Sequence, residues 1–158
     1  MGVDNSVEIN SQSWKHTQQI GEMLAGLALP GDVFLLKGQF GVGKTCLTQG
    51  IARGLGIAGN VSSPSFVVLK EYKGRLPLFH IDLYRFDDLV QVADLGLDDY
   101  LFGRGLCVVE WAEKAMELLP PEHLLVKLQF AGVDRRRLSF RPSGSRYEEM
   151  LKQTCNWR

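Results

Sequence analysis

The chain has 158 residues, of which 45% are hydrophobic and 23% charged, a globular composition that excludes a disordered protein. Its 18 Lys and Arg residues balance its 18 Asp and Glu residues, so the formal net charge is zero, which disfavours a protein that binds nucleic acid by itself. A chain of this length fits one domain, and we expect a single domain spanning residues 1–158.

The cysteines and the short apolar runs indicate the cellular compartment in which the protein is expected. Cys46, Cys107 and Cys155 are widely spaced, which suits neither a zinc site nor a disulfide framework. The apolar runs are far shorter than a membrane-spanning helix requires, and the N-terminal residues lack the apolar stretch of a signal peptide. We therefore expect a cytoplasmic protein with reduced thiols and no membrane association.

Strand-like and helix-like segments alternate in the first half of the chain. A segment with apolar residues at helical spacing ends at Pro30-Gly31, and the unbroken apolar run that follows is typical of a strand buried on both faces. The predicted elements are a strand over 7–9, a helix over 17–29, a strand over 33–36, a glycine-rich loop over 38–43 and a helix over 44–55.

The second half of the chain continues the alternation and adds a hairpin, because two strand-like runs flank the three residues Lys73-Gly74-Arg75. The predicted elements are a loop over 62–65, strands over 66–72 and 76–82, a partly helical segment over 87–101, a strand over 106–109, a helix over 111–119, strands over 124–130 and 137–140, and a helix over 145–153. This order predicts an α/β fold with a mixed, mostly parallel central sheet.

The glycine-rich loop carries the strongest chemical signal. Residues 38–45 read Gly-Gln-Phe-Gly-Val-Gly-Lys-Thr and match G-x-x-x-x-G-K-[ST] in full, between a predicted strand and a predicted helix. Glycines let such a loop curl so that backbone N–H groups point at phosphates, and the helix N-terminus adds further N–H groups. The motif predicts a P-loop NTPase-like three-layer fold, with Lys44 on the β- and γ-phosphates and the Thr45 hydroxyl on Mg²⁺. The nucleotide-binding residues expected in this segment are Gly38, Gly41, Val42, Gly43, Lys44, Thr45 and Cys46.

Two carboxylates follow predicted buried strands. Asp82 ends the run Leu78–Asp82, and Glu110 follows Cys107-Val108-Val109. In nucleotide-binding α/β sheets the ligand lies beyond the carboxyl ends of the strands, where an acid can hold Mg²⁺ or orient the attacking water. We expect Asp82 and Glu110 to be metal-binding and catalytic residues alongside Lys44. The sequence leaves open which acid serves the metal and which serves the water.

The loop around Pro64 is a candidate switch segment. Ser63 and Ser65 flank this proline, and a hydroxyl here could contact the γ-phosphate or the metal. An ordinary serine-rich turn is the alternative.

The type of nucleotide is indicated by the absence of guanine-binding motifs from the sequence. Neither the guanine-reading N-K-x-D nor the D-x-x-G segment of Ras-type GTPases occurs, which favours ATP over GTP. The basic cluster of Arg135, Arg136, Arg137 and Arg141 lies between two predicted strands and is interpreted as a hairpin tip rather than a kinase lid.

Four blocks in this order resemble the TsaE (YjeE) family. They are the phosphate loop, Ser63-Pro64-Ser65-Phe66, His80-Ile81-Asp82-Leu83-Tyr84-Arg85 and Val109-Glu110-Trp111-Ala112-Glu113. The resemblance runs from about residue 7 to residue 140. The last two blocks are specific, whereas the phosphate loop is generic.

The resemblance implies a Mg²⁺-dependent ATPase required to form threonylcarbamoyladenosine in tRNAs that read codons beginning with A. Proteins of this family act with the TsaB–TsaD complex, which transfers the threonylcarbamoyl group, and hydrolyse ATP to support repeated turnover. Contact with tRNA is then only indirect, through the partners. We expect hydrolysis to be slow for the protein alone and stimulated by the complex, since few cations lie near the loop in the sequence.

The resemblance also assigns individual residues. Ser65 stands where the family usually has threonine, so its hydroxyl is kept for a phosphate or metal contact, and Trp111 is expected near the nucleotide or the partner surface. Tyr84 and Arg85 are expected to brace the switch or face a partner, and His80 to be structural. Gln39, Phe40 and Val42 depart from the family pattern, and their side chains are expected to point away from the phosphates.

Two other functions remain open from the sequence. One is a small-molecule phosphotransferase, which requires an acceptor pocket with a base and an arginine lid. The other is a non-enzymatic adaptor, in which ATP binding orders the switch and hydrolysis is incidental.

Overall fold

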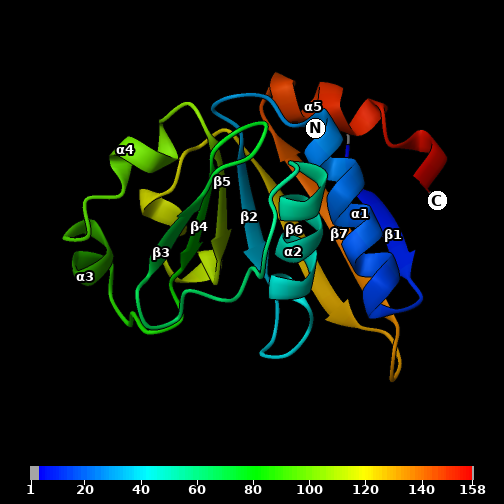
Figure 1. The fold of residues 1–158 in the computed structure, drawn as a ribbon, viewed down its shortest axis with the longest axis horizontal. Coiled ribbons are helices and arrows are strands. Elements are labelled where there is room, and N and C mark those ends of the chain that lie inside the picture. The colour runs from blue at the N-terminus through cyan, green and yellow to red at the C-terminus, as the bar shows by residue number, and fades with distance from the viewer. Residues whose placement is uncertain (1–3, 158) are drawn as a thin grey trace.

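The computed structural model describes residues 4–157 and forms one seven-stranded sheet with helices on both faces (Figure 1). The strands are β1 (Val7–Ser11), β2 (Val33–Lys37), β3 (Leu69–Tyr72), β4 (Leu78–Asp82), β5 (Leu106–Glu110), β6 (His123–Phe130) and β7 (Arg136–Ser143). The helices are α1 (Trp14–Leu27), α2 (Lys44–Gly54), α3 (Leu89–Ala93), α4 (Asp98–Leu101) and α5 (Ser145–Lys152), with 3₁₀ helices η1 (Ala112–Lys114), η2 (Met116–Leu118) and η3 (Cys155–Trp157). None of the helices within residues 4–157 is long and apolar enough to span a bilayer.

The sheet is mixed, with a parallel centre. Its strand order is β1-β7-β6-β2-β5-β4-β3, and the four central strands β6, β2, β5 and β4 run parallel. Antiparallel pairs flank this centre, β7 and β1 on one side and β3 on the other. The predicted α/β fold with a mixed, mostly parallel sheet is therefore confirmed.

Strand β2 explains why its sequence shows no alternation of polar and apolar residues. Phe34 and Leu36 point into the core beneath α1 and α2, whereas Val33 and Leu35 point into a second core on the other face. The second core is covered by α3, α4 and η1. A strand covered on both faces carries apolar residues at every position.

The predicted hairpin forms, but with different bounds. Strand β3 begins at Leu69 rather than residue 66, because the N–H groups of Val67 and Val68 turn back to the carbonyl oxygen of Pro64. The connection spans residues 73–77 rather than three residues. Arg75 within it donates its N–H to the carbonyl oxygen of Leu55, 2.7 Å away, so the connection is fixed by packing against the end of α2.

The predicted helix over 111–119 is wrong. Trp111 has φ 59°, in the left-handed region, and such a residue cannot continue a right-handed helix. Two single 3₁₀ turns, η1 and η2, follow instead, separated at Ala115. The segment is shaped by contacts around Trp111 that its local apolar pattern does not encode.

Helices α1 and α2 lie side by side and approach unusually closely because glycines face each other's backbone (Figure 1). A Cβ atom at Gly50 would lie 2.0 Å from the carbonyl oxygen of Gln18, and one at Gly21 would lie 2.4 Å from that of Leu47. Neither contact can be relieved by a side-chain rotation, since the obstructing atoms belong to backbone. The start of α2, which carries the phosphate loop, is thus pressed against α1.

We expect Gly50→Ala to lower the free energy of unfolding by about 3 kcal/mol, since the helices must separate to admit the methyl group. Gly26→Ala is the matched control, because Gly26 is an exposed α1 residue whose Cβ would meet no atom within 4 Å. That change should leave stability unaltered or raise it by about 0.5–1 kcal/mol. Urea denaturation measures both, and equal stabilities of the two variants would contradict the close packing.

Candidate functional site

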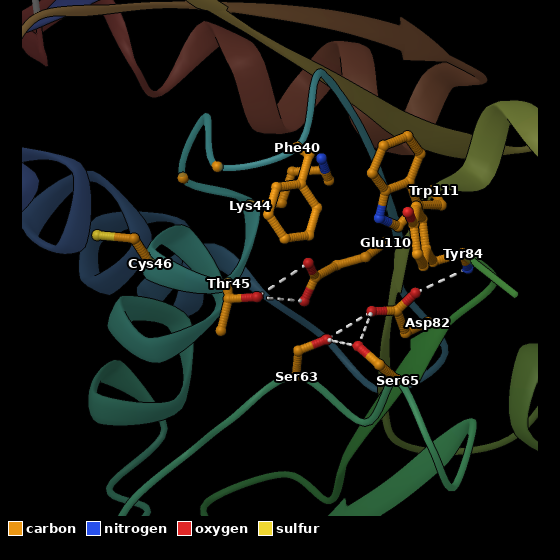
Figure 2. Close-up of a pocket in the computed structure, with 12 residues that line it drawn as sticks. Phe40, Lys44, Thr45, Cys46, Ser63, Ser65, Asp82, Tyr84, Glu110 and Trp111 are labelled. Carbon is orange, nitrogen blue, oxygen red and sulfur yellow. Dashed lines mark hydrogen bonds between the residues drawn. The ribbon is translucent and has the colours of Figure 1, made fainter.

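A cleft opens where the central parallel strands end. In the register of the sheet Leu36 lies beside Glu110, and Glu110 lies beside Asp82, so the carboxyl ends of β2, β5 and β4 meet at one edge. The cleft above this edge has a volume of about 350 Å³. Figure 2 shows its lining, which comprises Phe40, Gly41, Gly43, Lys44, Thr45, Cys46, Ser63, Ser65, Asp82, Tyr84, Glu110 and Trp111.

The loop over 38–43 adopts the curled shape that its glycines allow. Gly41 (φ 79°) and Gly43 (φ 117°) occupy the left-handed region, which residues with a Cβ atom rarely adopt. Helix α2 begins directly afterwards at Lys44, and its first N–H groups have no acceptor within the helix. Such a loop and helix start form an anion-binding concavity.

The loop is braced from outside the cleft by Arg136 of β7. Its Nε donates to the carbonyl oxygen of Val42 at 2.8 Å, while the Val42 side chain is fully buried. Arg136 therefore contacts the backbone of the loop from outside, and it does not line the cleft.

Lys44 is almost fully buried, and its ammonium is held by weak partners. Its Nζ donates to the carbonyl oxygen of Gln39 at 3.0 Å and to that of Gly38, and lies 4.0 Å from the centre of the Trp111 ring. Burial lowers the pKa of Lys44, an effect opposed by the nearby carboxylates, Glu110 foremost. A buried ammonium without a carboxylate in direct contact is favourably placed to receive an anionic phosphate.

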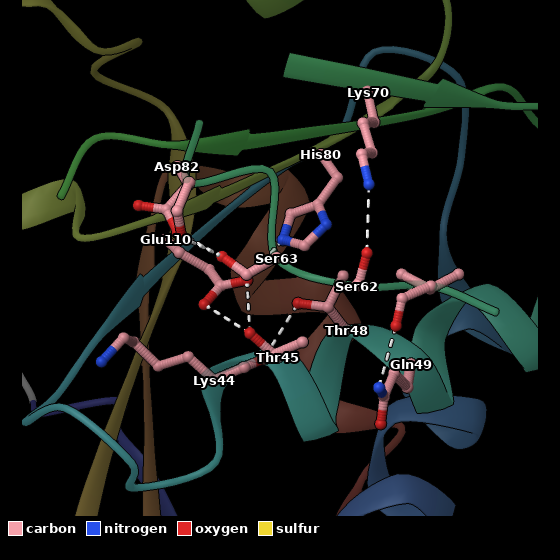
Figure 3. Close-up of polar contacts among 12 residues, drawn as sticks. Lys44, Thr45, Thr48, Gln49, Ser62, Ser63, Lys70, His80, Asp82 and Glu110 are labelled. Atoms are coloured by element: carbon pink, nitrogen blue, oxygen red, sulfur yellow. Dashed lines mark hydrogen bonds and ion pairs between the residues drawn. The ribbon is translucent and has the colours of Figure 1, made fainter. Parts of the chain in front are cut away.

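Glu110 links the phosphate loop to the sheet. The Thr45 hydroxyl donates to its carboxylate, with distances of 3.0 Å to Oε1 and 3.1 Å to Oε2, and the His80 Nε2 contacts Oε2 (Figure 3). Glu110 and His80 are both buried. The carboxylate and hydroxyl oxygens lie at the entrance to α2, and hard oxygen ligands of this kind suit Mg²⁺ beside a bound phosphate. The residues present therefore fit the expected metal.

Asp82 faces the loop around Pro64. Its Oδ2 accepts hydrogen bonds from the hydroxyls of Ser63 and Ser65, the latter at 3.3 Å, and its Oδ1 accepts the N–H of Tyr84 at 2.8 Å (Figure 3 shows the Ser63 contact). Ser63 and Ser65 are also hydrogen-bonded to each other at 2.9 Å. Asp82 thus fixes the serine loop in place, across the cleft from Thr45.

Trp111 and two further aromatic side chains form one rim of the cleft. The ring centres of Trp111 and Tyr84 are 5.0 Å apart, and those of Tyr84 and Phe40 are 6.1 Å apart (Figure 2). Phe40 is 78% exposed although it lines the cleft, so it extends over the opening. The expectation that Phe40 points away from the phosphate site is therefore wrong, whereas the buried Val42 does point away.

The structure brings together most residues that the sequence singled out. The side chains or backbone of Gly41, Gly43, Lys44, Thr45, Cys46, Ser65, Asp82, Glu110 and Trp111 line the one cleft. Cys46 turns its Sγ to the carbonyl oxygen of Trp14 at 3.3 Å, and burial raises its pKa, so it faces the site with its backbone only. Two of the expected nucleotide-binding residues do not line this cleft: Gly38 lines an adjoining groove, and the Val42 side chain is buried.

For three residues the sequence did not predict a contact with the site. Arg136 was interpreted as part of a hairpin tip, His80 as structural without a named partner, and Phe40 as facing away from the phosphates. Arg136 is 94 residues from Val42 in the chain, so no local pattern reveals their contact. For His80 the signal was available, since it precedes Asp82 by two residues and thus shares its face of β4.

Comparison with known proteins identifies relatives of this chain. The family model "Threonylcarbamoyl adenosine biosynthesis protein TsaE" matches residues 11–138. A Bacillus subtilis protein named "tRNA threonylcarbamoyladenosine biosynthesis protein TsaE" is 46% identical over 88% of this chain and 87% of its own length. A Treponema pallidum protein of the same name is 36% identical over 82% of this chain and 96% of its own length.

The fold has a close counterpart among solved structures. The crystal structure of Bacillus subtilis YdiB is similar with a TM-score of 0.87 and 38% identity, covering 99% of this chain and 98% of the other. Together with the match over residues 11–138, this shows that the chain belongs to the TsaE family.

Proposed function

We propose that this protein binds and hydrolyses Mg²⁺-ATP and acts with the TsaB–TsaD complex in forming threonylcarbamoyladenosine on tRNA. The observation that carries the ATPase part is the arrangement of Lys44, the Thr45–Glu110 pair and Asp82 around one cleft above a curled phosphate loop. The pathway rests on the names of the relatives, and the two described above each align with more than four-fifths of this chain.

The phosphate loop binds the triphosphate of ATP. The N–H groups at the start of α2 and of the curled loop donate to the phosphate oxygens, and Lys44 leaves the carbonyl oxygens of Gly38 and Gln39 to contact the β- and γ-phosphates. Thr45 and Glu110 would hold Mg²⁺. When bound, the metal supplies positive charge that offsets the negative charge of the phosphates.

Hydrolysis requires a water aligned with the bond between the β–γ bridging oxygen and the γ-phosphorus. Asp82 is placed to orient this water, because its carboxylate is hydrogen-bonded to Ser63 and Ser65 and not to Thr45. The water oxygen attacks phosphorus, the bridging oxygen leaves with ADP, and Asp82 Oδ2 accepts the water proton. The geometry thus favours Glu110 for the metal and Asp82 for the water, a division that the sequence left open.

The charges in the cleft explain why ATP hydrolysis by the protein alone should be slow. Among the described residues that line the cleft, Lys44 is the single cation, while Asp82 and Glu110 are both acidic. Charge that develops on the γ-phosphate is then poorly compensated, and in related chemistry a cation supplied by a partner accelerates the reaction strongly. We propose that the TsaB–TsaD complex completes the site.

Replacing the lysine tests the ATPase itself. We expect Lys44→Ala to reduce ATP hydrolysis, alone and with purified TsaB–TsaD, by about 100-fold or more, since a direct phosphate contact is lost. Lys152→Ala is the control, because this exposed lysine lies on the surface helix α5, pairs with Glu149 and does not line the cleft. Phosphate release measures the rates. Hydrolysis that Lys44→Ala leaves intact would refute the proposed ATPase.

The division between the two acids is tested by isosteric amides. We expect Glu110→Gln to raise the Mg²⁺ concentration needed for half-maximal ATP binding by about tenfold, because a charged ligand is lost. Asp82→Asn should leave Mg²⁺-dependent binding within about twofold and lower hydrolysis about 100-fold. Titration with a fluorescent ATP analogue at varied Mg²⁺ measures binding.

The opposite pattern in these two variants would reverse the assignment of the acids. A different outcome would favour the adaptor function. If Asp82→Asn binds ATP, cannot hydrolyse it and still supports many rounds of tRNA modification with the complex, hydrolysis is incidental.

A further inference from the structure

A second groove adjoins the nucleotide cleft, and Trp111 lines both. It lies at the carboxyl ends of β2 and β6 and has a volume of about 540 Å³, in the range that holds small ligands. We name it the β2–β6 groove. Its lining comprises Lys37, Gly38, Gln39, Trp111, Glu113, Lys127, Leu128, Gln129 and Phe130.

Two lysines stand side by side in this groove. Lys37 of β2 and Lys127 of β6 are direct partners in the parallel register, so their side chains leave the same face of the sheet. Both are exposed, and neither forms an ion pair with any of residues 4–157. Like charges on directly opposed strand positions repel each other, and a bound anion between them removes that repulsion.

The rest of the lining mixes the Trp111 ring with the polar side chains of Gln39, Gln129 and Glu113. Phe130 and Leu128 leave the opposite face of β6, where the Arg136 guanidinium lies 4.5 Å from the centre of the Phe130 ring. The Glu113 Oε1 is buried and has no hydrogen-bond partner among the described residues, and burial raises the pKa of this carboxyl while Lys44 and Lys37 oppose the effect. The groove therefore offers two cations, two side-chain amides and one unsatisfied acceptor beside the Trp111 ring.

We propose that the β2–β6 groove is the docking site for an acidic peptide segment of the partner complex, whose Asp or Glu side chain lies between Lys37 and Lys127. An apolar side chain of the segment packs on the Trp111 ring, and a backbone N–H donates to Glu113. This inference rests on the proposed function, because it locates the surface through which the partner reaches the ATPase.

The lining favours a peptide over nucleic acid. A phosphate backbone carries negative charge at every unit, and it would meet Glu113 as well as the two lysines. The formal net charge of zero gives no excess of positive charge over the chain as a whole. One further cation lies on the same face, since the exposed Arg137 is the register partner of Gln129, so a segment with a few acidic side chains matches the groove.

Docking here connects to the nucleotide site through Trp111. An occupant of the groove contacts the indole, and the same ring lies 4.0 Å from the Lys44 ammonium. A shift of the indole changes the surroundings of Lys44 directly. The groove is thus positioned to link partner binding to phosphate binding without occupying the cleft.

Charge reversal tests the inference. We expect the double variant Lys37→Glu/Lys127→Glu to bind purified TsaB–TsaD at least about tenfold more weakly, with loss of stimulated hydrolysis. Its thermal unfolding and its ATP affinity should stay within about 2 °C and twofold of the original, since neither lysine lines the nucleotide cleft. Lys37→Arg/Lys127→Arg should retain binding, and Lys73→Glu, in the exposed β3–β4 connection, is the matched reversal elsewhere.

A photo-crosslinking amino acid in place of Gln129 identifies the occupant. Mass spectrometry of the crosslinked TsaB–TsaD complex should give a segment that contains Asp or Glu. Full binding by the double charge-reversal variant overturns the groove inference while leaving the ATPase proposal intact, as do crosslinks to tRNA alone or to segments without acids. If the original protein itself fails to bind TsaB–TsaD, the proposed partnership fails first, and the docking site fails with it.

Discussion

The parallel register of β2, β5 and β4 is the constraint on which the rest of the site depends. It places the start of the phosphate loop, Glu110 and Asp82 at the ends of three adjacent strands that end together. The spacing between neighbouring strands is about 4.8 Å, so each acid falls within reach of a different part of a bound triphosphate. Thr45 then reaches Glu110 with its hydroxyl, and the serine loop reaches Asp82. Both contacts form without any departure from regular strand geometry.

The buried charges of the site stabilise one another only in part. Lys44 lies near Glu110, Asp82 and Glu113, yet its direct contacts are two carbonyl oxygens and an aromatic ring. Glu110 is buried against a hydroxyl and an imidazole. Such an arrangement costs folding free energy unless an oppositely charged ligand completes it. We interpret the incomplete pairing as an arrangement suited to a ligand that carries both phosphate and a divalent cation.

Much of the fold and the site could be predicted from local sequence. The phosphate loop, the buried strand before it and the two acids at strand ends follow from apolar runs and turn residues, and all appear in the structure. What could not be predicted depends on contacts between distant segments. The left-handed backbone of Trp111 replaces an expected helix by 3₁₀ turns, and Arg136 reaches the loop from β7. No periodicity within a short window contains that information.

The glycine contacts between α1 and α2 make the two walls of the cleft unequal. The wall built on α2 is backbone pressed on backbone at Gly21 and Gly50, which leaves no side chains that could yield. The facing wall is the loop over 62–68, which has no regular secondary structure and exposes Phe66 and Val67. It is fixed to the sheet by two hydroxyl contacts to the Asp82 carboxylate and by the Asp82 N–H, which donates to the carbonyl oxygen of Val68 at 2.9 Å. The two walls therefore differ in rigidity. A ligand in the cleft meets backbone packed on backbone on one side and, on the other, an irregular loop that carries the exposed Phe66.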